Sequence, residues 1–156
     1  MNITEISAVK RIGEMLPLLE EHADELATHR KIMVVKPDMD KYATLETKGM
    51  LVSLGLFDDA GKLAGYSVTY LVNNMHYSDL LMAQNDVLFI RKDLRKGRWG
   101  VKLIIETEKL CRDRLKAIGG DRPILMTWHG KPNTAFAELL PKLDYGVQDI
   151  LFSKVL

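Results

Sequence analysis

The sequence is poor in the features that mark secreted, membrane-spanning or strongly basic proteins. Its one cysteine, Cys111, excludes an internal disulfide and fits a reducing compartment. No apolar run reaches the ~18 residues that suggest a membrane span, and the N-terminus lacks the basic and apolar segments of a signal peptide. The formal net charge is only +1, so the chain as a whole is not built for a polyanion. We therefore expect a cytoplasmic protein that binds neither membrane nor nucleic acid.

The sequence also lacks the residue patterns of a metal site or a reactive thiol. None of the four histidines stands at metal-ligand spacing from another histidine or from a cysteine, which predicts no metal site. Cys111 lies within a periodic apolar stripe, so we expect a core residue and not a nucleophile. His22 and His29 are expected on the surface of a helix, whereas His129 follows a strand and is a weaker candidate for a site.

Apolar periodicity predicts one α/β domain over residues 1–156. The expected strands cover residues 3–6, 50–57, 63–72, 80–90, 124–128 and 148–155, and the expected helices cover 7–26, 37–48, 100–118 and 134–140. Pro17 predicts a break or kink in the first helix. The strand, helix and strand between 80 and 128 predict one parallel pair in a mixed, mostly antiparallel central sheet flanked by helices, an α+β arrangement.

The most informative segment is residues 86–104, where a strand ends in a basic loop that opens directly into a helix. Six basic residues gather there: Arg91, Lys92, Arg95, Lys96, Arg98 and Lys102. Free backbone N–H groups and the helix dipole make such a helix start a phosphate site. The alternative is a solvated basic helix cap. The loop fits neither the Walker pattern, which needs Gly-Lys-Ser/Thr, nor the three-glycine dinucleotide pattern.

The run Arg95-Lys96-Gly97-Arg98-Trp99-Gly100 resembles the acetyl-CoA pyrophosphate loop of GNAT N-acetyltransferases, usually Arg/Gln-x-x-Gly-x-Gly/Ala. Arg98 replaces the first glycine of that pattern. Phe89-Ile90 is similar to the strand end beside the pantetheine arm, and residues 133–145 are similar to the family's late helix. The combination of His76-Tyr77, Leu81-Met82-Ala83, the arginine-containing loop and the short Lys-x-Leu tail is most similar to GNAT proteins encoded by bacteriophages, which implies a host bacterial cytoplasm.

The resemblance implies acetyl-CoA as co-substrate and direct transfer of its acetyl group to a primary amine of a small molecule or protein. It implies this set of cofactor-binding residues: Leu88, Phe89, Ile90, Arg95, Lys96, Gly97, Arg98, Trp99, Gly100, Val101, Asn133 and Phe136. A backbone N–H near residues 88–90 would hold the oxyanion. Homodimers are common in the family.

The catalytic side chains are less clear, because Leu140 stands where the family often has a tyrosine acid and Tyr145 is expected in the core. Asp86 is the only carboxylate of its strand and is our candidate for the base, on the face that carries Gln84 and Leu88. The alternative is a structural strand-edge residue bonded to the backbone. His76 and Tyr77 precede that strand and are candidates for the acceptor side. The alternative from another class is an inactive module that binds an acyl-CoA or a host protein.

Overall fold

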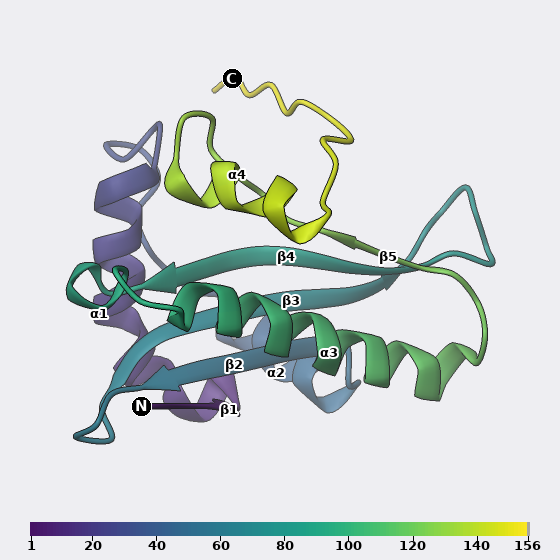
Figure 1. Cartoon of the computed structure of the whole chain (residues 1–156), viewed down its shortest axis with the longest axis horizontal. Coiled ribbons are helices and arrows are strands. Elements are labelled where there is room, and N and C mark those ends of the chain that lie inside the picture. Colours follow the sequence, from purple (N-terminus) through teal and green to yellow (C-terminus); the bar gives the residue numbers. More distant parts are fainter. Residues whose placement is uncertain (156) are drawn as a thin grey trace.

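A computed structural model describes residues 1–155 (Figure 1). The elements follow the predicted order closely until the last strand. They are β1 (Asn2–Glu5), α1 (Ala8–Leu26), α2 (Met39–Thr47), β2 (Leu51–Phe57), β3 (Leu63–Asn73), β4 (Leu81–Ile90), the 3-10 turn η1 (Lys92–Leu94), α3 (Trp99–Gly119), β5 (Ile124–Thr127), α4 (Ala135–Leu139) and the 3-10 turn η2 (Leu140–Leu143).

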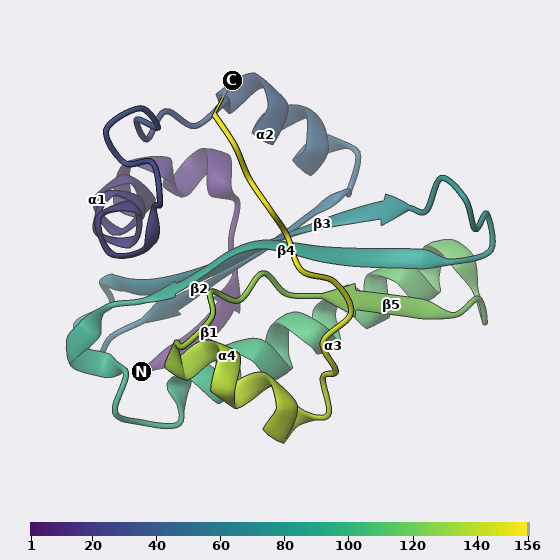
Figure 2. The same cartoon turned by 90° about the horizontal axis from the view of Figure 1, so that it is seen from above.

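The five strands form one mixed sheet in chain order, from β1 to β5. The first four strands pair antiparallel with one another, and β5 is parallel to β4, which confirms the predicted parallel pair. Helices cover both faces: α1 and α2 lie on one side, and α3 and α4 lie on the other (Figure 2). The predicted fold class is therefore correct.

Each face of the sheet has its own apolar core. Leu103 and Cys111 of α3 pack with Leu56 and Leu81 on one face. Burial raises the pKa of Cys111 to about 12, so its thiol stays protonated and inert. On the other face, Met15 of α1 packs with Tyr66, Val68 and Phe89.

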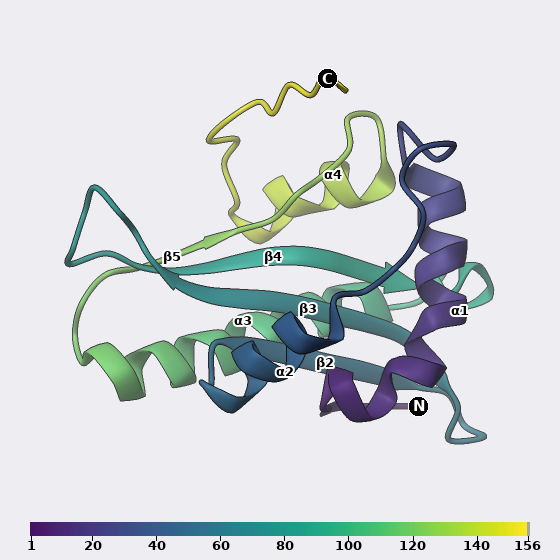
Figure 3. The same ribbon diagram turned by 180° about the vertical axis from the view of Figure 1, so that it is seen from behind.

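Helix α1 is continuous through Pro17, so the predicted break does not occur. Figure 3 shows instead that the helix axis changes direction after its first turns, which agrees with the predicted kink. Its start is fixed from α2, because the Glu46 carboxylate accepts hydrogen bonds from the Ser7 hydroxyl at 2.7 Å and from the backbone N–H of Ala8. The second helix begins after its cap Asp38, two residues later than Pro37 suggested.

The predicted final strand at residues 148–155 is wrong. The described part of this segment pairs with no strand, and Ile150, Leu151 and Phe152 are 75%, 86% and 88% exposed. Three consecutive apolar residues give a strand no single core face. Such a strand needs cover on both faces, whereas these three side chains are left exposed. Across residues 1–155, no helix is both long enough and apolar enough to span a membrane.

Candidate active site

Strands β4 and β5 separate at one end, and a cavity opens there. They pair only over Leu81–Gln84 of β4, so within the described chain residues 85–90 have a strand partner on one side alone. A cavity of about 410 Å³ lies against this free edge. Its walls are α1, the end of β4, the basic loop and the segment from residue 129 to α4; we call it the β4-edge cavity. It is lined by His22, Glu25, Leu26, Asp86, Val87, Leu88, Phe89, Ile90, Arg95, Gly100, His129, Lys131, Thr134, Ala135, Phe136 and Leu139.

The predicted cofactor residues divide into two groups. Six line the β4-edge cavity: Leu88, Phe89, Ile90, Arg95, Gly100 and Phe136. The others, Lys96, Gly97, Arg98, Trp99, Val101 and Asn133, lie on the segments beside it without lining it. Trp99 packs against the core of the α3 face, and Lys102 lies over its ring at 4.4 Å from the centroid.

The start of α3 exposes backbone N–H groups toward the basic loop. Arg98 is its cap residue, its side chain makes no capping hydrogen bond, and its carbonyl accepts the first helical bond, from Lys102. The N–H groups of the first turn are therefore left for water or an anion. A Cβ added to Gly100 would lie 3.8 Å from Cδ1 of Ile90, an ordinary contact. Packing within the chain does not require this glycine, whereas close approach of a ligand would.

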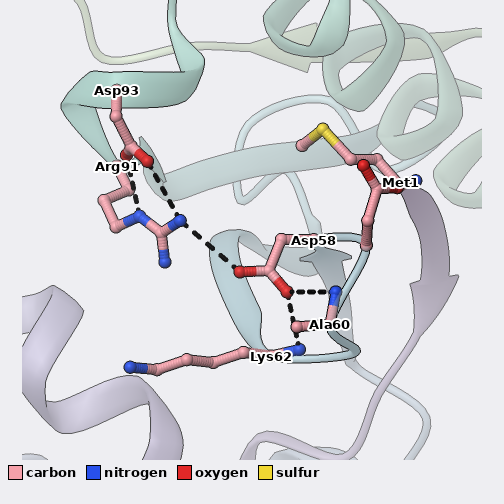
Figure 4. Close-up of polar contacts among 7 residues, drawn as sticks. Met1, Asp58, Ala60, Lys62, Arg91 and Asp93 are labelled. Atoms are coloured by element: carbon pink, nitrogen blue, oxygen red, sulfur yellow. Dashed lines mark hydrogen bonds and ion pairs between the residues drawn. The ribbon is translucent and has the colours of Figure 1, made fainter.

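The basic residues of the loop are not equally available. Arg91 is tied to Asp93 and Asp58, at 2.7 Å and 3.4 Å, as Figure 4 shows. Asp58 in turn accepts from the backbone N–H groups of Ala60 and Lys62, so this network fixes the turn between β2 and β3. Arg91 therefore serves the structure of the turn.

Arg95 lies at the cavity but is partly engaged by the chain itself. Its guanidinium forms two bonds of 2.9 Å to the Glu25 carboxylate and donates through Nε to the carbonyl of Ile90 at 2.6 Å. It also lies 5.0 Å from the centre of the Phe89 ring. Hydrogen bonding from Arg95 holds the pKa of Glu25 below its ordinary value, so the pair is ionised at neutral pH.

A β-bulge presents Asp86 on the face covered by α1 and α2. Thr69 pairs with Asn85 and Val68 with Val87, which leaves Asp86 as the extra residue. Asn85 is buried and donates to Thr69 Oγ1 and to the carbonyl of Val68, each at 3.0 Å, which fixes the bulge.

The expected alternation therefore fails after Asp86. Leu88 packs against the α3 core, whereas Asp86 accepts a 3.3 Å hydrogen bond from Tyr70 on the opposite face. The expectation that Asp86 and Leu88 share a face is wrong, because a bulge inserts one residue into the two-residue repeat. Burial, and then the charge of Asp86, raise the pKa of Tyr70, so it remains a donor.

The structure does not bring His76 and Tyr77 to Asp86. Both lie in the turn between β3 and β4, where their backbone N–H groups donate to Asn74 Oδ1. Asp86 is five residues beyond Leu81, the first residue of β4, roughly 17 Å along an extended strand. Neither residue lines the β4-edge cavity.

Several cavity residues escaped sequence reasoning. His22 was expected on the surface, but its ring stacks on Phe89 with centroids 5.1 Å apart. Lys131 donates to Thr28 at 2.7 Å and so links the far wall to the end of α1. Tyr145 packs edge-on against Trp128 with ring centroids 6.2 Å apart, outside this cavity. His22 reaches the cavity only because α1 packs against this edge of the sheet. The spacing of residues in the sequence carries no signal of that contact.

The chain resembles several solved structures over nearly its whole length. It matches a tetramutant of the BH1408 protein from Bacillus halodurans with a TM-score of 0.72 at 17% identity, covering 100% of both chains. It matches an aminoglycoside acetyltransferase, meta-AAC0020, from an uncultured soil metagenomic sample, with a TM-score of 0.70 at 14% identity, covering 99% of this chain and 95% of that one. The chain has the GNAT fold.

A third match is the ribosomal-protein-alanine N-acetyltransferase from Brucella melitensis biovar Abortus 2308, with a TM-score of 0.60 at 18% identity. It covers 97% of this chain and 100% of that one. No protein-family model and no curated protein matches the sequence. At these identities the likeness establishes the fold, and a bacteriophage origin stays a prediction.

Proposed function

We propose that this chain, as one domain over residues 1–156, is an acetyl-CoA-dependent N-acetyltransferase that acetylates a primary amine. The observation that carries the proposal is the β4-edge cavity, which joins a free strand edge to the exposed start of α3. Neighbours with this fold include an aminoglycoside acetyltransferase and a ribosomal-protein-alanine N-acetyltransferase. The acceptor class, small molecule or protein, stays a prediction.

The residues at the β4-edge cavity fit acetyl-CoA, the co-substrate that the fold implies. The first turn of α3 offers backbone N–H groups and, from Lys96 and Arg98, two exposed cationic side chains for a pyrophosphate. The free edge of β4 offers backbone groups to the amide-containing pantetheine arm. When bound, acetyl-CoA supplies an acyl group activated as a thioester.

Two requirements of amide formation fall to the protein. The amine must lose a proton before it can attack. Two carboxylates line the cavity, and Glu25 is held in its ion pair with Arg95, so Asp86 is the one that can take the proton, through water. The carbonyl oxygen gains negative charge during attack, and a backbone N–H on the free edge near Leu88 would stabilise it. The Tyr70 hydroxyl orients Asp86 from the neighbouring strand.

Calorimetry with acetyl-CoA tests the first half of the proposal. Acetyl-CoA should bind and raise the melting temperature, since a ligand that binds the native state alone stabilises it. NAD and ATP should have much smaller effects, because the loop lacks both of their glycine patterns. If acetyl-CoA at millimolar concentration produces no heat and no thermal shift, the cavity serves another ligand.

A further inference from the structure

His22 lies where the proposed reaction needs a proton carrier. It extends from α1 into the wall of the β4-edge cavity, which Asp86 also lines. Its ring stacks on Phe89 at an interplanar angle of 25°. Leu140 occupies the position of the tyrosine acid that the resemblance implies, and no tyrosine is among the described residues that line the cavity. The leaving thiolate therefore has no tyrosine beside it.

Tyr66 fixes the orientation of the His22 ring. Its hydroxyl lies 3.4 Å from Nδ1 of His22, and the Tyr66 side chain is fully buried. This contact occupies the inner ring nitrogen, which leaves Nε2 to exchange a proton. Burial raises the pKa of Tyr66, so it stays protonated and does not compete as a base. The role proposed below requires the tautomer in which Nδ1–H donates to the Tyr66 oxygen, so that Nε2 carries the free lone pair.

The polar groups around His22 come from five parts of the chain. Glu25 lies on the same helix, Arg95 on the basic loop, Asp86 on β4 and Tyr66 on β3, while His129 and Lys131 form the far wall. Burial lowers the pKa of His22; Glu25 and Asp86 oppose the shift, and Arg95 adds to it. A lowered histidine pKa leaves the ring neutral at pH 7 and able to accept a proton.

We propose that His22 is a catalytic residue that carries a proton from the attacking nitrogen to the departing sulfur. The proposal rests on the proposed function. Asp86 first passes one proton of the substrate ammonium to solvent through water. The nitrogen then forms the bond to the acyl carbon, and the carbon–sulfur bond breaks with its electron pair on sulfur.

The proton that the nitrogen sheds on attack passes to Nε2 of His22 and then to the thiolate. The products are the acetamide, the free thiol and one proton in solvent, and His22 returns to its neutral form. One histidine thus acts as base and then as acid, a pattern known from other acyl transfers.

NMR of the wild-type protein gives the first test, independent of activity. The His22 ring should titrate below the ordinary histidine value of 6.5, and its neutral form should carry the proton on Nδ1. Ring nitrogen shifts report both properties. Titration at or above 6.5, or a neutral form protonated on Nε2, would overturn the proposal. This measurement uses the wild-type protein, so it tests the proposal even if a His22 variant fails to fold.

Kinetics of His22→Gln give the second test. The turnover number should fall ~10²-fold or more, the usual effect of removing a positioned acid–base group, while acetyl-CoA affinity by calorimetry stays unchanged. The wild-type pH–rate profile should bend at the pKa that NMR measures for His22, and the variant should lack that bend.

Two further variants control the kinetic test. His29→Gln, on the turn after α1 and outside the cavity, should behave as wild type. Tyr66→Phe should lower turnover by a smaller factor, because it removes only the partner of Nδ1. Retention of the rate or of the bend in folded His22→Gln would refute the role of His22. A wild-type protein that acetylates no amine would instead refute the proposed function.

Discussion

The Arg95 guanidinium forms a two-pronged ion pair with Glu25, with both nitrogen–oxygen distances at 2.9 Å. This pair fastens α1 to the loop that precedes α3 and places Glu25 and His22 of one helix against the same cavity. It also neutralises one of the cations expected to meet a phosphate. Lys96 and Arg98 remain as exposed cations on the loop before α3, and Lys102 is exposed in its first turn.

Glu25→Gln should lower the melting temperature at pH 7 by removing the charged half of this pair. The pKa of Glu25 is depressed from its ordinary value of 4.5, so the pair stabilises the fold above that value and loses its effect as pH falls through the lower, folded-state pKa. The difference between wild type and variant should therefore shrink in acid. Glu21→Gln on the same helix is the control, and an equal loss at every pH would contradict the assignment.

Arg98→Ala should weaken acetyl-CoA binding by ~1–3 kcal/mol, the range for a hydrogen bond to a charged group. Arg98 replaces the glycine of the expected loop, so Arg98→Gly should cost less, because it restores close backbone approach. Calorimetry on both variants measures the difference, with Lys109→Ala on the exposed side of α3 as the control. Equal affinity in wild type and both variants would show that Arg98 only contacts solvent.

Gly100→Ala should separate stability from binding. Alanine is the better helix former by up to ~1 kcal/mol, and the added Cβ meets only an ordinary contact with Ile90, so the melting temperature should hold or rise. Acetyl-CoA affinity should fall, because the same methyl group occupies the space of an approaching phosphate. Gly13→Ala in α1, where nothing lies within 4 Å of an added Cβ, should stabilise without affecting affinity. Undiminished binding by Gly100→Ala would place the phosphate elsewhere.

Much of the fold could be predicted from local patterns. The turn at residues 58–61, the helix stops at Gly49 and Gly120, and the strand-loop-helix unit around Arg95 all depend on neighbours in sequence. Gly49 and Gly120 adopt φ angles of 67° and 65°, as helix ends at glycine require.

The site itself depended more on long-range contacts. The bulge at Asp86 arises from pairing with β3 and from the buried bonds of Asn85, which no alternation of apolar residues reveals. His22 enters the cavity because α1 crosses the sheet beside Phe89, a consequence of packing alone. The strand prediction for residues 148–155 was wrong because the segment has strand-forming residues but no sheet edge pairs with it.

Asp86→Asn keeps the shape of the side chain and removes its capacity to take a proton. Turnover should fall by ~10²–10⁴-fold, the usual contribution of a general base, while acetyl-CoA affinity barely changes. Tyr70→Phe should have a smaller effect, because it removes only the 3.3 Å hydrogen bond to Asp86. Asp113→Asn on the surface of α3 is the control. A folded Asp86→Asn variant with near wild-type turnover would end the assignment of Asp86 as base.

The most direct test of the account is acetyl transfer itself. Wild-type protein and Asp86→Asn are incubated with acetyl-CoA and a panel of amines and proteins, and release of free thiol and gain of one acetyl group are followed by mass spectrometry. The account predicts amine-dependent acetylation by the wild type and little by the variant. Binding of acetyl-CoA without acetylation of any amine or protein would contradict it and identify an inactive module on the same fold.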